Sequence, residues 1–163
     1  MEIFTCDIEP FDIKKPKPDR DDVHLKDVRQ VMSLLACIGG REAPYDDVQV
    51  GAFLEEEKAK DYFVARTEQG EIVGVAVLAP VEDSEGRQIS LEGLAVNPFH
   101  RRKGIGSGLF IETIRRARGW QYDEMVLIVS AMLRGIAERA GAKTYTAGNG
   151  VVHATVDLRA KAA

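Results

Sequence analysis

The chain has 163 residues, of which 45% are hydrophobic, enough to bury one core but short for two ordinary domains. Its formal net charge of -4 argues against broad binding to nucleic acid, because neutralising phosphates takes an excess of Lys and Arg on one face. We therefore expect a single domain over residues 1–163, with its core between about 11 and 158.

The chain also lacks the patterns of secreted, membrane and metal-binding proteins. Its first seven residues have neither the basic nor the apolar stretch of a signal peptide, and its longest uncharged apolar run, 72–81, is too short to span a bilayer. We expect a cytoplasmic protein with no membrane partner. Cys6 and Cys37 have no metal-like spacing, which favours two reduced thiols and no metal site.

The N-terminal half of the sequence predicts an edge strand, two helices and a hairpin. Prolines at 16 and 18 would end a first, edge strand over residues 11–15. Apolar residues at three- and four-residue spacing predict a helix from Asp21 or Asp22 to the glycines at 39 and 40. A shorter helix begins near Asp46 or Asp47 and ends in the acidic run 55–57. Turn residues at 68–70 predict a hairpin of strands 62–66 and 72–79.

The second half changes from antiparallel strands to a crossover pattern. A strand at 89–96 leads through a glycine-rich loop into a helix over 106–118, which Gly119 ends, and then into an apolar strand at 125–129. A helix over 131–140 and strands at 143–146 and 151–158 complete the chain. The sum is an α/β fold with one mixed sheet of about seven strands and helices on both faces.

The loop after the strand 89–96 carries the chemistry. Its glycines stand where side chains would block an approaching ligand, and the first N–H groups of the following helix have no partner inside the helix. These groups lie at the positive end of the helix dipole and suit a pyrophosphate. Arg101, Arg102 and Lys103 add positive charge. A Rossmann fingerprint needs a third glycine or alanine at a spacing that is missing here, and a Walker loop needs Gly-Lys-Ser or Gly-Lys-Thr; neither pattern is present. The simpler alternative is a plain helix cap with a solvated basic triplet.

The segment Arg101-Arg102-Lys103-Gly104-Ile105-Gly106 resembles the acetyl-CoA signature of the GNAT acyltransferase superfamily: Arg or Gln, two residues, Gly, one residue, then Gly or Ala. The preceding Leu-Ala-Val-Asn-Pro and the order of elements agree with it. The resemblance implies an acyl-CoA N-acyltransferase fold and acetyl-CoA as the donor. The residues that it implies for acetyl-CoA are Leu94, Ala95 and Val96 for the pantetheine arm, and Arg101, Arg102, Lys103, Gly104, Ile105, Gly106 and Ser107 for the pyrophosphate.

The resemblance further implies that the N–H of Val96 faces the thioester oxygen, where a fixed donor stabilises the charge that develops during attack. Gly93 inside the strand favours either a bulge, which would splay this strand from 125–129, or a close packing contact.

An amine acceptor needs a base, since an alkylamine with a pKa of about 10.4 is mostly protonated at neutral pH. Glu92 is the catalytic candidate, because strand alternation puts it on the same face as Leu94 and Val96 unless a bulge intervenes. A salt-bridged surface carboxylate is the alternative.

In many family members a tyrosine of the late helix protonates the departing thiolate, but the matching residue here is Ala137. Three possibilities remain: Ser130 or a tyrosine such as Tyr145 takes the role, solvent takes it, or the domain binds CoA without efficient turnover. The simpler reading of Ser130 is a helix N-cap.

The resemblance also suggests where the acceptor enters, past residues 39–47 and 148–152. Acidic residues at 46, 47 and 55–57 would attract a cationic amine, or else form a solvated helix face. We expect an N-acetyltransferase acting on a primary amine of a small molecule, peptide or protein. The alternative is a noncatalytic acyl-CoA-binding or sensory module. A homodimer follows only by family analogy, and we expect no nucleic-acid partner despite the arginines at 115, 116 and 118.

Overall fold

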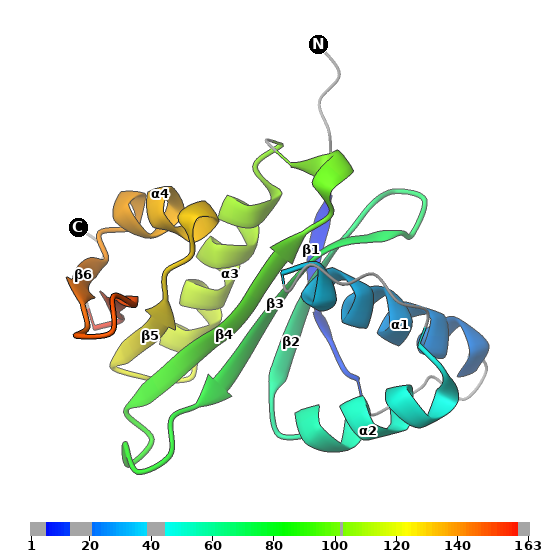
Figure 1. The fold of residues 1–163 in the computed structure, drawn as a ribbon, viewed down its shortest axis with the longest axis horizontal. Coiled ribbons are helices and arrows are strands. Elements are labelled where there is room, and N and C mark those ends of the chain that lie inside the picture. The colour runs from blue at the N-terminus through cyan, green and yellow to red at the C-terminus, as the bar shows by residue number, and fades with distance from the viewer. Residues whose placement is uncertain (1–5, 14–20, 39–44, 102, 160–163) are drawn as a thin grey trace.

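The computed structural model describes residues 6–13, 21–38, 45–101 and 103–159. Within these residues, seven strands form one mixed sheet in the order β1-β2-β3-β4-β5-β7-β6, in which only β4 and β5 run parallel. Four α-helices and a short 3-10 helix connect them (Figure 1). In chain order the elements are β1 (Asp7–Phe11), α1 (Asp21–Ile38), α2 (Asp47–Glu57), β2 (Asp61–Arg66), β3 (Ile72–Pro80), β4 (Gln88–Val96), η1 (Pro98–His100), α3 (Ile105–Gly119), β5 (Glu124–Ile128), α4 (Ala131–Arg139), β6 (Lys143–Thr146) and β7 (Val152–Asp157).

The predicted mixed sheet with helices on both faces is confirmed. One apolar layer lies between the sheet and α3 and α4 and contains Leu94, Leu109 and Phe110. The other lies under α1 and contains Val31 and Val75. Figure 1 shows α1 and α2 together on one side of β4, and α3 and α4 on the other. Helix α1 buries Val28, Val31 and Met32 of the apolar face that its sequence period predicts.

The first strand was placed too late in the sequence. Residues 11–15 were expected to form it, but β1 spans Asp7–Phe11 and pairs antiparallel with β2. Proline is tolerated at position 10 because β1 is an edge strand, where a missing N–H leaves no ladder bond unmade. Ion pairs reinforce the edge, since the Arg66 guanidinium lies 2.8 Å from Glu9 and 3.1 Å from Asp27. Residues 14 and 15 lie outside the described residues.

Two further observations bear on the sequence predictions. Cys6 is a free, half-buried thiol, while the side chain of Cys37 lies outside the described part of the chain. Within that part, none of the helices has the length and apolarity needed to cross a membrane.

Candidate active site

The loop between β4 and α3 is built by local sequence chemistry. The side chain of Asn97 accepts a hydrogen bond from the N–H of Phe99 (3.0 Å) and starts η1, with Pro98 in its first turn. Gly104 then takes the left-handed conformation, with φ 80°, and stands as the N-cap of α3. A residue with a Cβ is strained at this φ, so glycine is required for this entry into the helix.

The first amide groups of α3 precede its ladder of helical hydrogen bonds. The first hydrogen bond of the helix runs from the N–H of Gly108 to the carbonyl of Gly104 at 2.9 Å. The N–H groups of Ile105, Gly106 and Ser107 therefore precede the helical ladder and lack a helical acceptor. They lie at the positive end of a helix of 15 residues.

Positive side chains flank these amides. Arg101 and Lys103 are exposed, while Arg102 lies outside the described residues. A Cβ added at Gly106 would lie 3.4 Å from Ile136 Cδ1 and 3.7 Å from Val96 Cγ2, so this glycine lets α3 start close to β4 and α4. First-turn amides with positive side chains beside them are features that suit an anionic ligand.

Strand β4 carries a bulge next to this loop. Val77 of β3 pairs with Gly93 and Leu78 pairs with Leu91, so Glu92 is an extra residue without a partner on β3. A Cβ at Gly93 would lie 3.1 Å from Leu35 Cδ2 of α1. Both readings of Gly93 hold, because the bulge and the close packing contact occur at the same residue.

Beyond the bulge, β4 and β5 separate. Their parallel pairing covers only Gln88 to Leu91 on β4 and Glu124 to Leu127 on β5. Strand β5 stays with β7 instead, and the N–H of Val129 bonds to the carbonyl of Val152 at 2.8 Å. The edge of β4 that faces β5 is therefore open over Leu94, Ala95 and Val96.

The backbone of this open edge points in a defined direction. The N–H of Asn97 donates to the carbonyl of Val73 on β3 at 2.8 Å, which makes these two residues a hydrogen-bonded pair. Bonded and non-bonded pairs alternate in an antiparallel ladder. The N–H groups of Leu94 and Val96 therefore point away from β3, toward the gap between β4 and β5, while that of Ala95 points to β3.

Glu92 does not lie on the face that strand alternation predicts. Leu91, Leu94 and Val96 belong to the apolar layer under α3, but the bulge turns Glu92 to the opposite face. There its Oε2 lies 2.7 Å from the Nζ of Lys60, and 39% of the side chain is exposed. The salt-bridged reading is thus correct for the structure, and Glu92 remains beside the point at which the strands separate.

Lys60 joins Glu92 to a carboxylate of α2. Its Nζ also lies 2.9 Å from Glu57 Oε2, and that oxygen accepts a hydrogen bond from the hydroxyl of buried Tyr62 at 2.9 Å. Desolvation lowers the pKa of Lys60, but its bonds to the two glutamates outweigh this and raise it. Burial, and then the hydrogen bond to Glu57, raise the pKa of the Tyr62 hydroxyl far above its ordinary range.

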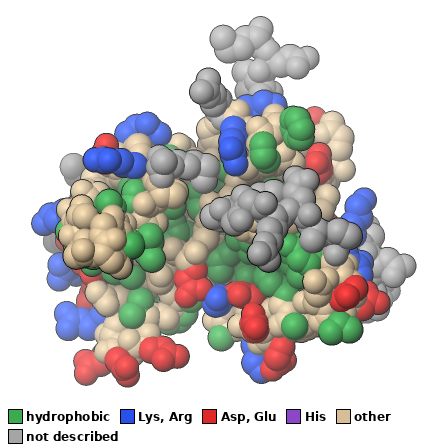
Figure 2. Space-filling view, viewed as in Figure 1, with side chains coloured by type: hydrophobic (Ala, Val, Ile, Leu, Met, Phe, Trp, Pro, Cys, Tyr) green, Lys and Arg blue, Asp and Glu red, His purple; other side chains and the backbone are tan. Residues whose placement is uncertain are grey.

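We call Glu57, Lys60, Tyr62 and Glu92 the Lys60 network. In the space-filling view, acidic and basic side chains lie next to each other between β4 and α2 (Figure 2). Sequence reasoning missed Glu57, Lys60 and Tyr62 as partners of Glu92. The only local signal was the charged run that ends α2, and such runs are also typical of solvated surfaces.

Three other acidic residues at the ends of α2 have structural partners. Asp46 caps α2 and forms a reciprocal pair of bonds with Gln49. Asp47 pairs with Arg29, and Glu55 pairs with Lys58. Asp46, Asp47 and Glu55 thus stabilise the helix and its surface, as the solvated-face reading expects, and Glu57 is the exception.

Ser130 lies two residues after the end of β5 and caps α4. Its Oγ accepts a hydrogen bond from the N–H of Leu133 at 3.3 Å, which confirms the N-cap reading. Accepting this bond leaves the hydroxyl proton available, so capping does not exclude a second role. Ala137, at the family's tyrosine position, is fully buried in the apolar layer under α3.

A row of side chains crosses the sheet from the bulge to its far edge. Leu91 pairs with Leu127, so Ile128 follows on β5 where Glu92 follows on β4. Ile128 pairs with His153, and His153 pairs with Tyr145. The rings of Tyr145 and His153 stack at 5.1 Å, and Ile128 and Tyr145 are 63% and 58% exposed. This face lies next to the late strands that were expected to guide an acceptor. Of the other expected segment, residues 39–44 lie outside the described chain.

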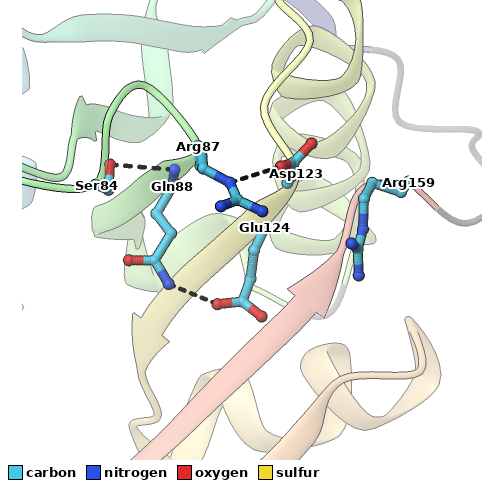
Figure 3. A pocket seen from close by; sticks show the side chains of 6 residues that line it. All are labelled: Ser84, Arg87, Gln88, Asp123, Glu124 and Arg159. Carbon is cyan, nitrogen blue, oxygen red and sulfur yellow. Dashed lines mark hydrogen bonds and ion pairs between the residues drawn. The ribbon is translucent and has the colours of Figure 1, made fainter.

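A pocket of about 300 Å³ lies at the opposite end of β4 and β5 (Figure 3). Ion pairs and hydrogen bonds fill its lining, with Arg87 bound to Asp123 at 3.2 Å and Gln88 bound to Glu124 at 2.7 Å. It lies at the start of both strands, whereas the open edge lies at the end of β4. Two arginines of α3 are also engaged, since Arg115 and Arg116 both pair with Glu112.

Several solved acetyltransferase structures have a fold similar to that of this chain. An acetyltransferase from Trypanosoma brucei aligns with a TM-score of 0.69 at 18% identity, covering 88% of this chain and 96% of its own. The ribosomal-protein-S18-alanine N-acetyltransferase from Escherichia coli gives 0.64 at 15% identity, covering 97% of both chains. A GNAT family acetyltransferase from Elizabethkingia anophelis with acetyl-CoA bound gives 0.60 at 17% identity, covering 93% of this chain and 97% of its own.

The family model described as the acetyltransferase (GNAT) family matches residues 28–137, more than half of the chain. The chain belongs to the GNAT acetyltransferase family. Among curated proteins, no sequence matches it.

Proposed function

We propose that this protein is an N-acetyltransferase that transfers an acetyl group from acetyl-CoA to a primary amine by direct attack. The observation that carries the proposal is the open edge of β4 beside the free amides that start α3. A strand edge with outward N–H groups suits an extended amide-bearing arm, and a helix start suits a pyrophosphate. In this protein the two lie next to each other along the chain.

Each part of the donor has a group of residues that fits it. The edge over Leu94, Ala95 and Val96 would hold the pantetheine arm. Gly104, Ile105, Gly106 and Ser107 would bind the pyrophosphate through their backbone, with Arg101, Arg102 and Lys103 supplying positive charge. Bound acetyl-CoA supplies an activated acetyl thioester. The outward N–H of Val96 is then the donor placed to stabilise negative charge on the thioester oxygen.

Two side chains are assigned to proton transfer. Glu92 would accept the proton of the incoming ammonium, directly or through a water molecule, because it stands where β4 and β5 diverge and is partly exposed. Ser130, two residues after the end of β5 at the N-cap of α4, would donate a hydrogen bond to the departing thiolate. Tyr145 is less well placed, since β7 separates its strand from β5.

The acceptor would approach over the row from Glu92 to Tyr145. Ile128 supplies an apolar surface next to Glu92, and the stacked rings of His153 and Tyr145 supply an aromatic one farther out. The second carboxylate of the Lys60 network adds negative charge, which attracts an alkylammonium.

A noncatalytic CoA-binding module is the second candidate, and buried Ala137 is the observation that favours it, because it removes the family's tyrosine. Thiol release should be measured with acetyl-CoA and a panel of primary amines that includes aliphatic, aromatic and peptide N-terminal members. Turnover on at least one amine supports the proposal. Tight CoA binding without thiol release from any of them supports the module.

A further inference from the structure

The Lys60 network places one ammonium between two carboxylates. The Nζ of Lys60 lies 2.7 Å from Glu92 Oε2 and 2.9 Å from Glu57 Oε2. The side chain of Lys60 is 27% exposed and that of Glu57 is 16% exposed, so solvent screens their pair less than it screens a surface pair. One ammonium is thus shared between two carboxylates.

The network is anchored at its inner end. Tyr62 is 3% exposed and donates its hydroxyl proton to the same Glu57 oxygen that Lys60 contacts. Its ring packs edge-on against Phe53 of α2, with 6.1 Å between ring centroids. Tyr62 of β2 therefore holds the Glu57 carboxylate in place. Glu57 in turn holds the ammonium of Lys60, which contacts Glu92.

We propose that Lys60 is a positioning residue, whose ammonium holds Glu92 at the bulge as a carboxylate while Glu57 moderates that effect. This inference rests on the proposed function, in which Glu92 accepts a proton from the acceptor amine. A base must be ionised to take up a proton, and a neighbouring cation favours its ionised form.

The charged and titratable groups that face Glu92 come from three parts of the fold. Glu57 comes from α2, Lys60 from the connection between α2 and β2, and Tyr62 from β2. Removing the ammonium leaves two carboxylates facing each other, and like charges favour protonation. Removing the charge of Glu57 instead leaves Glu92 as the one carboxylate of the network that pairs with the Lys60 ammonium. The two changes therefore act on Glu92 in opposite directions, which a merely structural role for Lys60 does not produce.

The test is an NMR titration of the Glu92 side-chain carboxyl in protein without CoA, so that it does not depend on turnover. Its resonance is assigned by its loss in Glu92→Gln. Because the ammonium lies against Glu92, we expect Lys60→Met to move the titration midpoint upward and Glu57→Gln to move it downward. Lys60→Arg keeps the charge and should hold the midpoint within a few tenths of a unit. Lys58→Met is the matched control, because Lys58 pairs with Glu55 at the surface, and it should change nothing.

The pH profile of kcat/KM on a responsive amine completes the test. We expect the acidic limb to move with the midpoint, upward in Lys60→Met and downward in Glu57→Gln. An unmoved midpoint in folded Lys60→Met, with Glu92→Gln inactive, overturns the role of Lys60 alone. Should Lys60→Met fail to fold, Glu57→Gln decides by the same comparison. Full turnover by Glu92→Gln overturns the base role and the positioning role together.

Discussion

Leu91 of β4 pairs with Leu127 of β5, and this is the last pair that the two parallel strands make. The next residue of β4 is the bulged Glu92, and the next of β5 is exposed Ile128. From this point β4 keeps its partner β3 and β5 keeps its partner β7, so the backbone edge between them stays open. A carboxylate, an apolar side chain and a free strand edge thus meet where the sheet divides.

Replacement of Glu92 by Gln tests the base. The amide keeps the shape of the side chain but cannot take up the proton, so kcat should fall about a hundredfold or more. Affinity for CoA should be unchanged, because Glu92 lies on the other face of β4 from Leu94 and Val96. Steady-state thiol release and calorimetric CoA titration measure the two quantities. Glu56→Gln, an exposed neighbour on α2, is the control, and equal kcat in both variants would remove Glu92 from the mechanism.

The left-handed conformation of Gly104 predicts that replacing it by alanine lowers the free energy of unfolding, whereas the same change at Gly51 raises it. Gly104→Ala forces a Cβ into a φ of 80° and should lower the free energy of unfolding by about 1 kcal/mol. Gly51 is exposed within α2 and no heavy atom lies within 4 Å of an added Cβ. Gly51→Ala should therefore raise the free energy of unfolding by about 0.5 kcal/mol. Urea unfolding measures both, and a stabilised Gly104→Ala would contradict the assigned helix start.

Two substitutions separate the helix-capping role of Ser130 from its proposed role as a proton donor. Ser130→Ala removes the N-cap of α4 and should cost about 1 kcal/mol of stability. Ser130→Asn keeps a capping oxygen and should leave stability nearly unchanged, but it lacks the hydroxyl proton. If Ser130 assists the thiolate, both variants lose turnover to a similar degree at a temperature where both are folded. Normal turnover in folded Ser130→Asn would leave solvent as the proton source.

Tyr62 predicts how stability depends on alkaline pH. Its pKa is raised in the folded state, so above about pH 10 the unfolded chain loses a proton that the folded chain keeps. The free energy of unfolding should therefore fall as pH rises, by up to about 1.4 kcal/mol per unit from this group. Tyr62→Phe should show a shallower decline between pH 10 and 11.5 in urea titrations. Parallel declines in the two proteins would show that Tyr62 ionises normally.

Features encoded by neighbouring residues could be predicted from the sequence. The loop is an example, because Asn97, Pro98 and Gly104 each act on the backbone beside them. The bulge at Gly93 could be anticipated for the same reason. The roles of Leu94 to Ser107 came from the family resemblance, and the structure adds that the N–H groups of Leu94 and Val96 point into the gap.

Features that depend on distant partners were missed. The position of β1 is set by its pairing with β2, more than fifty residues later, and by ion pairs to Arg66. The face of Glu92 depends on whether the bulge includes it, which a periodic pattern does not show. The Lys60 network joins α2, β2 and β4, so its members have no fixed spacing in the sequence.

The central claim is that the open edge of β4 and the amide groups at the start of α3 bind CoA. Isothermal calorimetry of CoA titrated into the folded protein tests it most directly. We expect a saturable signal with one site per chain, weakened in Gly104→Ala and unchanged in Gly51→Ala. Absence of any binding heat from folded protein, at several temperatures, would contradict it.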